Sequence, residues 1–538
     1  MTKTGRAKGI VLAILLAAGS GASAAPVLTR ADVERAISQF KPVIAHALQD
    51  SGLPGLAVGV VFEDEVLWIG TYGVREVGNP APIDRDSLFQ LASISKPIGS
   101  TLIARLVGEG RVSWEDRMID YSPDFKLADD WTSRHVTLAD LYSHRSGLPD
   151  HAGEELEEFG YTQQQIVERL RLEPLQAFRA GFEYTNYGLT AAAEAAVSVT
   201  GKSWEDASRD LLYLPAGMNS TTSRFDQYLA SPNRAVPHVR HPDGHWSADF
   251  QQDPSRASPA AGVASTISDM TRWLRLQLNG GVIDGVRIVD EKALAQTHAP
   301  YMMLAAPATY TARTTHYGLG WFVYSDDFGQ MRWAHAGSFA LGAATNAAMI
   351  PARKLGIVIL TNGFPMGIPE ALTESFFDLA MTGKESRPWY EQYRDDYARV
   401  LYPQVQIDYR RPPADAIPPR RLDRYVGTYS NAFFGDVEVA HEGDHLTMRV
   451  GPWRRPFVLG HYSGNTFWYI PPGEFGVVPS PATFSFDKQR VNLIWGRRQA
   501  DGSFADDPHG PLVRTLACAS EPLDQQNRGS CLPAGAPR

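Results

Sequence analysis

The pair of side chains best suited to chemistry in this chain is a serine and a lysine separated by two residues, Ser93 and Lys96. Apolar residues follow at helical spacing up to Gly108, and this pattern predicts a helix that begins at Ser93. One helical turn places both side chains on the same face, and the helix N-terminus favours developing negative charge. A hydroxyl beside an amine can lose its proton and attack a carbonyl carbon, so the pair predicts a nucleophilic serine.

The Ser-x-x-Lys pattern is weak by itself, because a second copy, Ser485 to Lys488, lies in a segment that reads as a strand. Short patterns of this kind arise by chance. The alternative interpretation of Ser93 is a helix-capping serine beside a solvated lysine. Further motifs must decide between the two.

Two later segments carry such motifs. Tyr184 and Asn186 open a predicted helix that continues through residues 189–199. His335, Gly337 and Ser338 precede strand-like stretches at residues 341–350 and 355–360. Gly337 would let a substrate approach the backbone closely.

Ser-x-x-Lys, Tyr-x-Asn and His-x-Gly in this order resemble the penicillin-binding-protein-like serine hydrolases. This family includes class C β-lactamases, D-alanyl-D-alanine carboxypeptidases, D-amino-acid peptidases and esterases. Four more segments resemble family signatures, and with the motifs they span residues 30–383: Leu141 to Pro149, Leu214 to Met218, Ala261 to Thr266 and Tyr317 to Trp321. Seven ordered matches are far more specific than any one motif.

The resemblance implies a role for each motif residue. Ser93 would be the nucleophile, with Lys96 and Tyr184 as its proton relay and Asn186 holding Lys96 and the substrate amide. Free lysine and tyrosine have pKa values of about 10.4 and 10, too high for a base at neutral pH, so their surroundings must change these values. Either residue, or the coupled pair, could accept the serine proton. The N–H groups of Ser93 and Ser338 would form the oxyanion hole.

His335 departs from the pattern of the β-lactamases, which usually carry lysine at this position. Ala336 also replaces the hydroxyl residue that helps the family bind a substrate carboxylate. Carboxylate recognition is therefore expected to be weakened unless an arginine compensates. His-x-Gly is more frequent in the peptidases and esterases of the family, and the alternative for His335 is a purely structural histidine.

Little in the sequence supports another type of hydrolase or a metal site. No Gly-x-Ser-x-Gly occurs in the chain, which excludes the nucleophile elbow of α/β-hydrolases. His238, His241 and His245 are three histidines where a structural zinc site needs four ligands. The turn signal of Asp243-Gly244 predicts instead a hairpin that carries solvent-exposed histidines. We expect neither a metal ion nor another cofactor.

The N-terminus predicts export. Lys3, Arg6 and Lys8 precede an apolar run over residues 10–18 and small residues up to Ala24, as in a secretory signal peptide of residues 1–24. The apolar run is about half of the ~20 residues that a membrane span needs, so we expect a periplasmic or secreted mature protein without membrane insertion. Loss of the three basic residues changes the net charge from −9 to about −12, which makes nucleic acid an unlikely partner.

The rest of the chain divides into further segments. A catalytic domain is predicted at residues 26–383 and a Pro- and Arg-rich linker at 384–421. Alternating short strands at 422–516 predict an antiparallel barrel or sandwich, and its opening Tyr-x-Gly-x-Tyr resembles a lipocalin-like domain that can narrow the active-site mouth in relatives. Its aromatic residues are equally explained as barrel core. The tail at 517–538 holds Cys518 and Cys531, either as a disulfide or as two free thiols.

The sequence thus predicts an α/β (α+β) β-lactamase-like fold, with an antiparallel sheet flanked by helices, a helical lobe and a C-terminal β domain. The function expected from the resemblance is a serine hydrolase that forms an acyl-enzyme, foremost a peptidase on small or D-residue-containing peptides. The two-domain layout also resembles the bacterial peptidase that cuts linearised microcystin. Alternatives are a carboxylesterase, a β-lactamase or D,D-carboxypeptidase, and an inactive peptide-binding or cell-wall protein. The oligomeric state stays open.

Overall fold

A computed structural model describes residues 27–515 of the 538-residue chain, except 242, 308, 310–311, 365–366, 402–405, 473–477, 488–489 and 499–502. The predicted leader at 1–24, the tail at 517–538 and both cysteines lie outside the described residues. Within them, no helix has the length and apolar character that crossing a bilayer requires.

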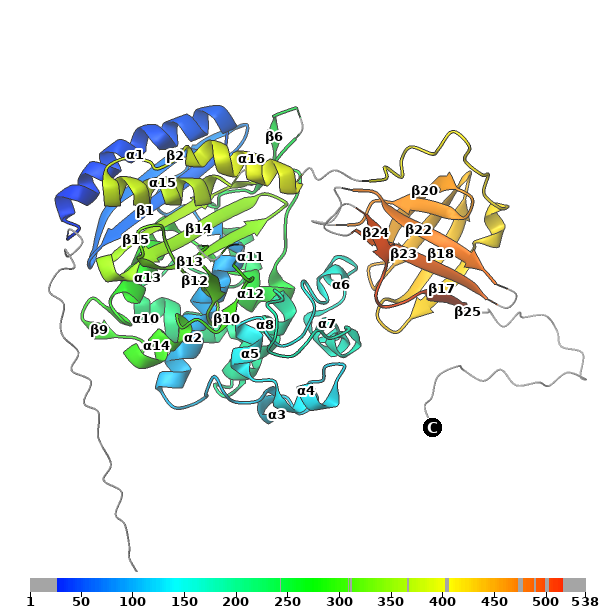
Figure 1. The fold of residues 1–538 in the computed structure, drawn as a ribbon, viewed down its shortest axis with the longest axis horizontal. Helices are drawn as coiled ribbons and strands as arrows, with labels where there is room; N and C mark the ends of the chain where they lie inside the picture. The colour runs from blue at the N-terminus through cyan, green and yellow to red at the C-terminus, as the bar shows by residue number, and fades with distance from the viewer. Residues whose placement is uncertain are drawn as a thin grey trace, which may run out of the picture.

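A nine-stranded sheet forms the centre of the larger part of the molecule (Figure 1). The strands pair antiparallel throughout. In spatial order they are β10 (Met302–Met303), β11 (Thr315–Tyr317), β12 (Phe322–Ser325), β13 (Met331–Phe339), β14 (Ala343–Ile350), β15 (Leu355–Thr361), β1 (Gly55–Phe62), β2 (Glu65–Glu76) and β3 (Asn79–Pro82).

Both faces of this sheet are buried, which explains why its central strands are apolar without alternation. In β1, Leu56, Val58 and Val60 join one core cluster, whereas Ala57 and Val61 join another. Helices α1 (Arg30–Ser51) and α15 (Ile368–Thr382) cover the first face. Helix α13 (Ile267–Leu278) packs on the second, and the two layers of helices lie above and below the sheet in Figure 1.

The segment predicted as a linker, residues 384–421, contains a helix that the prediction did not include. Helix α16 (Trp389–Leu401) packs against α15, and Tyr390 is buried in the same core cluster. The Tyr390 hydroxyl donates to Asp50 on α1 at 2.8 Å. The chain therefore adds a third helix to this face of the sheet before it leaves the larger part of the molecule.

The other face of the sheet carries the helical lobe. Helix α2 (Ser95–Gly108) runs between this lobe and the sheet, beside α8 (Asn186–Ser198) and α12 (Ser258–Ala261). The remaining helices are α3 (Met118–Tyr121), α4 (Asp130–His135), α5 (Leu138–Tyr142), α6 (Glu154–Glu158), α7 (Gln163–Arg169), α9 (Trp204–Ser208), α10 (Leu214–Ala216), α11 (Phe225–Ala230) and α14 (Glu291–Thr297).

Eight strands of the C-terminal part close into an antiparallel barrel, since β22 pairs with both β21 and β23. The short β24 (Phe504–Asp506) extends β23 outside the ring. The barrel strands are β17 (Gly427–Asn431), β18 (Gly435–Glu442), β19 (His445–Val450), β20 (Arg455–Ser463), β21 (Thr466–Tyr469), β22 (Ser480–Phe486), β23 (Val491–Arg498) and β25 (Leu512–Thr515).

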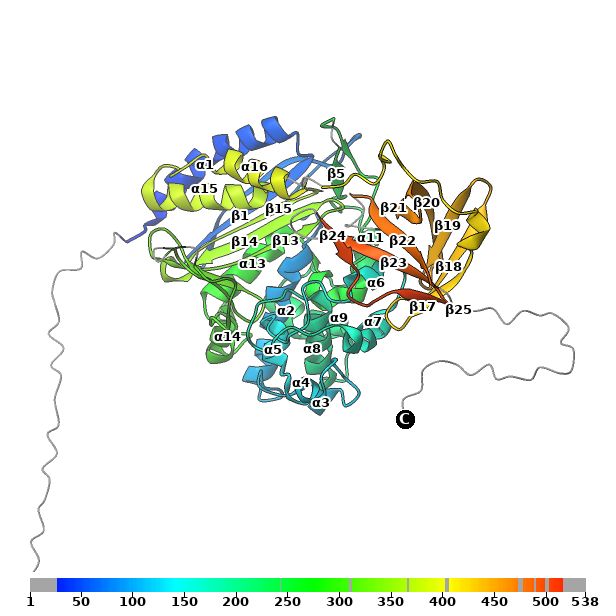
Figure 2. The ribbon, with the colours of Figure 1, turned by 45° about the vertical axis from the view of Figure 1, so that its right-hand side comes forward.

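The barrel docks on the segment that holds α6 and α7, as Figure 2 shows. Phe159 is buried against Phe434, Phe457 and Trp495 of the barrel, with ring centroids 6.1–6.3 Å apart. The Tyr161 hydroxyl donates to the Phe434 carbonyl oxygen at 2.5 Å. A continuous apolar core thus joins the barrel to the helical lobe.

A second contact between the two parts is ionic. His509, just before β25, places Nδ1 2.8 Å from Asp507 and Nε2 3.0 Å from Glu173 of the lobe, and Glu155 lies 3.9 Å from Nδ1. Burial disfavours the imidazolium, but the hydrogen bonds and charges of Asp507 and Glu173 outweigh burial and raise the pKa of His509 to about 9. The charged ring therefore bridges the two parts of the chain at neutral pH.

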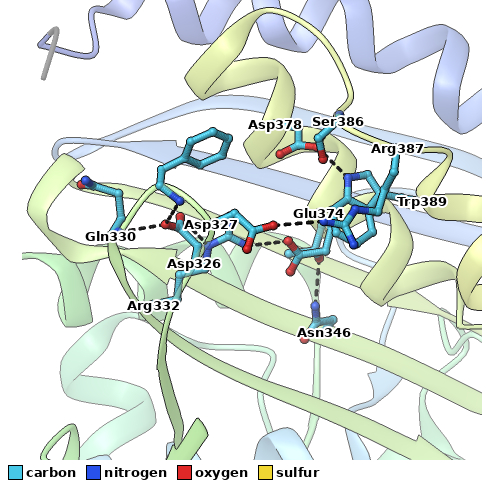
Figure 3. Close-up of polar contacts among 12 residues, drawn as sticks. Asp326, Asp327, Gln330, Arg332, Asn346, Glu374, Asp378, Ser386, Arg387 and Trp389 are labelled. Carbon is cyan, nitrogen blue, oxygen red and sulfur yellow. Dashed lines mark hydrogen bonds and ion pairs between the residues drawn. The ribbon is translucent and has the colours of Figure 1, made fainter. Parts of the chain in front are cut away.

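A buried ion-pair network supports the sheet at the turn between β12 and β13 (Figure 3). Arg332, 2% exposed, donates through Nε to Asp326 at 3.0 Å and through Nη1 to Glu374 on α15 at 2.6 Å. Its guanidinium also lies 4.6 Å from the ring centroid of Phe377. Paired with two carboxylates, this cation ties the strand to the helix that covers it.

The predicted histidine hairpin is present, but one of its histidines differs from the prediction. Strands β5 (His238–Arg240) and β6 (Trp246–Ser247) pair antiparallel, and the rings of His241 and His245 stack. His238 is fully buried: its Nε2 accepts from the Val77 N–H and its Nδ1 lies 3.0 Å from the Asn362 carbonyl oxygen. Packing against the sheet end thus overrides the exposure that the turn signal predicted.

Candidate active site

Ser93 lies in a short 3₁₀ turn (Ala92–Ile94) that leads directly into α2. The preceding residue, Ala92, has φ 47°, a left-handed conformation that is strained for a residue with a side chain and occurs most often at functional sites. Leu91 is fixed on both sides, because its N–H donates to Val263 and its carbonyl accepts from the Thr345 hydroxyl. The chain is thereby held in a sharp turn that presents Ser93.

Lys96 follows one turn later with its ammonium against the serine. Nζ donates to Ser93 Oγ and to the Ala260 carbonyl oxygen, both at 3.0 Å. The lysine is fully buried, and burial lowers its pKa to about 7, although the charge of Glu154 opposes the shift. A substantial fraction of neutral amine is therefore present at neutral pH, as a proton acceptor requires.

Tyr184 lies over the same ammonium, with its ring centroid 4.5 Å from Lys96 Nζ. Burial raises the pKa of Tyr184, and the Ser93 hydroxyl opposes the shift. The ring packs on His144 at 4.5 Å, whose Nδ1 accepts from the Thr185 N–H at 3.1 Å. The tyrosine is thus a neutral phenol at neutral pH, held by a buried neutral imidazole whose pKa burial lowers.

Asn186 begins α8 but does not bond Lys96. Its Nδ2 donates to Glu154 at 2.7 Å, and Glu154 also pairs with His151 Nδ1 at 2.7 Å. Burial disfavours the charged form of His151, but the hydrogen bond and charge of Glu154, together with the charge of Asp150, outweigh burial and raise the pKa of His151 to about 9. Asn186, which was predicted to hold Lys96, therefore contacts Glu154 instead, a carboxylate that was not predicted to belong to the site.

His335 is buried, 1% exposed, and both its ring nitrogens have partners. Nδ1 lies 2.5 Å from the Ala336 carbonyl oxygen and must donate, so Nε2 accepts from the Tyr317 hydroxyl at 2.8 Å. Burial and the charge of Lys96 lower its pKa to about 3. The imidazole is consequently neutral and offers no positive charge where β-lactamases carry lysine.

Gly337 and Ser338 bring the edge of β13 to the nucleophile. A Cβ on Gly337 would lie 2.1 Å from the Leu91 carbonyl oxygen and 2.9 Å from Ser93 N. Only glycine allows strand and turn to approach this closely. Ser338 is thereby placed beside Ser93, and both line the same cavity.

That cavity brings together residues from the lobe and the sheet. Its described lining is strongly acidic on one side, and neither lysine nor arginine occurs in it. The residues are Ser93, Glu154, Glu157, Glu158, Asn186, Gln252, Pro254, Ala257, Ala261, Ser338 and Phe339. No described barrel residue contributes to this lining.

The acidic side of the site was not predicted from the sequence. Glu154, Glu157 and Glu158 follow the Leu-Pro-Asp segment that carried a family signature. Their spacing places all three on one face of a helix, and this spacing is visible in the sequence. Ala260 carried no comparable signal, because a contact of a backbone carbonyl depends on the tertiary fold. Tyr317 lies in a segment that resembles a family signature, but its hydrogen bond to His335 was not predicted.

Comparisons with known proteins identify relatives of this chain. A family model described as Beta-lactamase matches residues 40–374, and one described as Domain of unknown function (DUF3471) matches residues 411–501. Penicillin-binding protein 4 of Amycolatopsis lactamdurans is 26% identical over 70% of this chain and 93% of its own length. The D-alanyl-D-alanine-carboxypeptidase/endopeptidase AmpH of Escherichia coli is 23% identical over 64% of this chain and 88% of its own.

A third relative matches more of the chain: Unguisins hydrolase ungD of Aspergillus violaceofuscus is 24% identical over 82% of this chain and 86% of its own length. Among solved structures, the octameric penicillin-binding protein homologue from Pyrococcus abyssi aligns with a TM-score of 0.57 and 19% identity. It covers 89% of this chain and all of the other. At that identity the match supports the fold and not the assembly.

Proposed function

The chain belongs to the beta-lactamase family of serine hydrolases, and we propose that it is a peptidase that acts through an acyl-enzyme on Ser93. The observation that carries the proposal is the contact of Ser93 Oγ with Lys96 Nζ at 3.0 Å, together with the pKa of about 7 for that lysine. A neutral amine at this distance can take the serine proton.

In the proposed reaction, Lys96 Nζ accepts the proton of Ser93 Oγ while the oxygen attacks the substrate carbonyl carbon. The N–H groups of Ser93 and Ser338 stabilise the resulting oxyanion. Collapse of the tetrahedral intermediate breaks the scissile bond, and the leaving nitrogen takes the proton from Lys96, directly or through the Tyr184 hydroxyl. Attack of water on the acyl-Ser93 ester, again assisted by Lys96, releases the acid and restores the hydroxyl.

Peptides are favoured over β-lactams because the described lining of the cavity offers no lysine or arginine to a substrate carboxylate. His335 is neutral and buried, and Ala336 provides no hydroxyl. Peptidase action is also supported by AmpH, a relative whose name specifies carboxypeptidase and endopeptidase activity. Unusual peptides, including D-residue-containing or linearised cyclic ones such as linearised microcystin, belong to the substrate range proposed here.

The test is mass spectrometry of a mixed panel of L- and D-peptides, short acyl esters and penicillins incubated with the full chain. We expect peptide cleavage by the wild type and none by Ser93→Ala, with an unchanged thermal midpoint. Ser485→Ala, in the second Ser-x-x-Lys sequence, is the matched control and should cleave like the wild type. Hydrolysis of the esters alone would show that the activity is that of a carboxylesterase and not of a peptidase. Failure of a fluorophosphonate to label folded wild-type Ser93 would favour an inactive binding protein.

A further inference from the structure

One face of α6 turns three carboxylates toward the cavity that contains Ser93. Glu154, Glu157 and Glu158 stand at positions i, i+3 and i+4, which share one side of a helix, and all three line the cavity. The opposite side of the same segment packs on the barrel through Phe159. The acidic face is therefore fixed in the active site and is not a solvated helix surface.

The three carboxylates differ in how far the protein neutralises them. Glu154 is paired with His151, and the one hydrogen bond that Glu157 accepts from a described residue comes from the Tyr187 hydroxyl, at 2.8 Å. For Glu158 no hydrogen bond or ion pair is found among the described residues. Burial raises the pKa of Glu157 to about 8 and also raises that of Glu158. A bound cation would reverse both shifts.

The arginines whose charge acts on these two glutamates do not pair with them. Arg256 and Arg455 influence the pKa of Glu158 through charge alone, and the Arg256 guanidinium lies 4.7 Å from the ring centroid of Trp453. Within the described part of the chain, neither glutamate has a lysine or arginine nitrogen within 4.0 Å. The cavity thus contains two carboxyl groups for whose charged forms no described lysine or arginine supplies a paired counter-charge.

Asn186 indicates independently that the cavity lacks a hydrogen-bond donor. It lines the cavity beside the glutamates, and its Oδ1 is buried without a hydrogen-bond partner among the described residues. A buried acceptor without a donor costs about 1–3 kcal/mol, and a ligand that brings N–H groups would remove this cost. An anion would instead find no lysine or arginine to pair with in the described lining of the cavity.

We propose that the cavity binds a cationic amine of the substrate, with Glu157 and Glu158 as its counter-charges and Asn186 Oδ1 as an additional acceptor. This inference rests on the proposed acyl-enzyme function and names the substrate class of the same site. The amine is either the α-ammonium of a peptide N-terminus or a side-chain ammonium near the scissile carbonyl. Both present the same chemistry to the glutamates.

Kinetics on matched substrates test the proposal with the full chain. One acyl group is presented as an anilide in three forms: with a free α-amine, N-acetylated, and N-acetylated with a side-chain amine. We expect kcat/KM to be at least about 100-fold higher for one or both amine forms than for the uncharged form. Whichever amine form is preferred identifies the source of the ammonium.

Substitutions of the two glutamates test whether these residues cause the preference for amine substrates. Glu158→Gln should lower that preference at least about tenfold, mainly through a higher KM, and Glu157→Gln should act in the same direction. Glu168→Gln, an exposed carboxylate on the next helix, is the matched control and should keep the wild-type preference. Equal rates for charged and acetylated substrates, or a preference that survives both variants, would overturn the inference.

A binding measurement separates this inference from the proposed reaction. Calorimetry with Ser93→Ala should show that D-alanine amide binds at least about tenfold more tightly than its N-acetyl form, with the difference lost in Ser93→Ala/Glu158→Gln. If the wild type hydrolyses nothing in the panel, the proposed function fails while this result still supports the amine site. Hydrolysis without discrimination, or equal binding of both amides, contradicts the amine site alone.

Discussion

Gly337 lies so close to Leu91 that a Cβ at position 337 would stand 2.1 Å from the Leu91 carbonyl oxygen. The same atom would lie 2.9 Å from the backbone nitrogen of Ser93. Real Cβ atoms do not approach backbone oxygens at such a distance, so either the strand or the turn would have to move. The glycine therefore sets the spacing between β13 and the proposed nucleophile.

We expect Gly337→Ala to lower kcat at least about 100-fold, since displacements of about 1 Å cost that much in a positioned site. The free energy of unfolding should fall by only about 1–3 kcal/mol, as for other overpacked positions. Gly181→Ala is the control, because nothing lies within 4 Å of its Cβ position. Near-normal turnover in a folded Gly337→Ala protein would contradict the positioning role.

The pKa of about 7 at Lys96 predicts a pH-dependent rate. Only the neutral amine accepts a proton, so kcat/KM should rise with pH through a midpoint near 7 and level off above it. Lys96→Arg should lose activity and this limb together, because guanidinium stays protonated. The pKa of Glu157 is about 8, so the limb must persist in Glu157→Gln. A rate that is flat between pH 5.5 and 8.5 would disagree with Lys96 as the base.

The sequence predicted the local geometry of the first motif better than that of the later ones. Ser93 and Lys96 are one helical turn apart, and this spacing alone fixes their contact once the helix exists. The expected Asn186–Lys96 contact is absent, since Asn186 bonds Glu154 instead. The choice between two acceptors depends on how α6 and α8 pack, which no local pattern encodes.

The same limit applies to the larger fold. Strands β1 and β15 were recognisable from uninterrupted apolar runs, because both faces of the sheet are covered. Helix α16 was not, since its segment is rich in polar and charged residues, and Tyr390 alone is deeply buried among the side chains described for this helix. The docking of the barrel through Phe159 could not be predicted either, because the sequence around an aromatic residue does not indicate which surface that residue packs against.

The buried pairs of Arg332 predict a large stability effect. Arg332→Met leaves Asp326 and Glu374 without their cation, and breaking a buried ion pair costs about 3–5 kcal/mol. Chemical denaturation of the full chain measures the loss. Arg387→Gln is the control from the same region (Figure 3), because its pair with Asp327 is exposed and should be worth less than about 1 kcal/mol. Equal effects of both changes would argue against the buried network.

The ionic contact of His509 predicts a stability that depends on pH. Its pKa is about 9 in the folded chain and about 6.5 in the unfolded chain. The stabilisation is therefore complete below about pH 6.5 and is lost as the pH rises through 9. The carboxyl of Glu155 acts in the same direction, since burial and the charge of Asp507 raise its pKa to about 7.

We expect His509→Gln to lower the free energy of unfolding by about 3 kcal/mol at pH 6 and by much less at pH 9.5. His445→Gln, on a more exposed histidine of β19, should have little effect at either pH. The ligand atoms of Glu155, Asp507 and His509 lie within 4.8 Å of one another, a spacing that could also hold a metal ion. If EDTA treatment lowers the thermal midpoint, a metal ion bound by these three residues, and not a charged His509, would explain the contact.

Phe159 connects the barrel to the acidic face of α6, because it directly follows that helix and inserts among Phe434, Phe457 and Trp495. Phe159→Ala should cost about 3–5 kcal/mol of unfolding free energy. It should also raise KM for amine substrates more than it lowers kcat, since Ser93 and Lys96 keep their own contacts. The control Val458→Ala removes an exposed side chain of the barrel and should change stability by less than about 0.5 kcal/mol. If Phe159→Ala destabilises the protein and leaves KM unchanged, the barrel stabilises the lobe without shaping the substrate site.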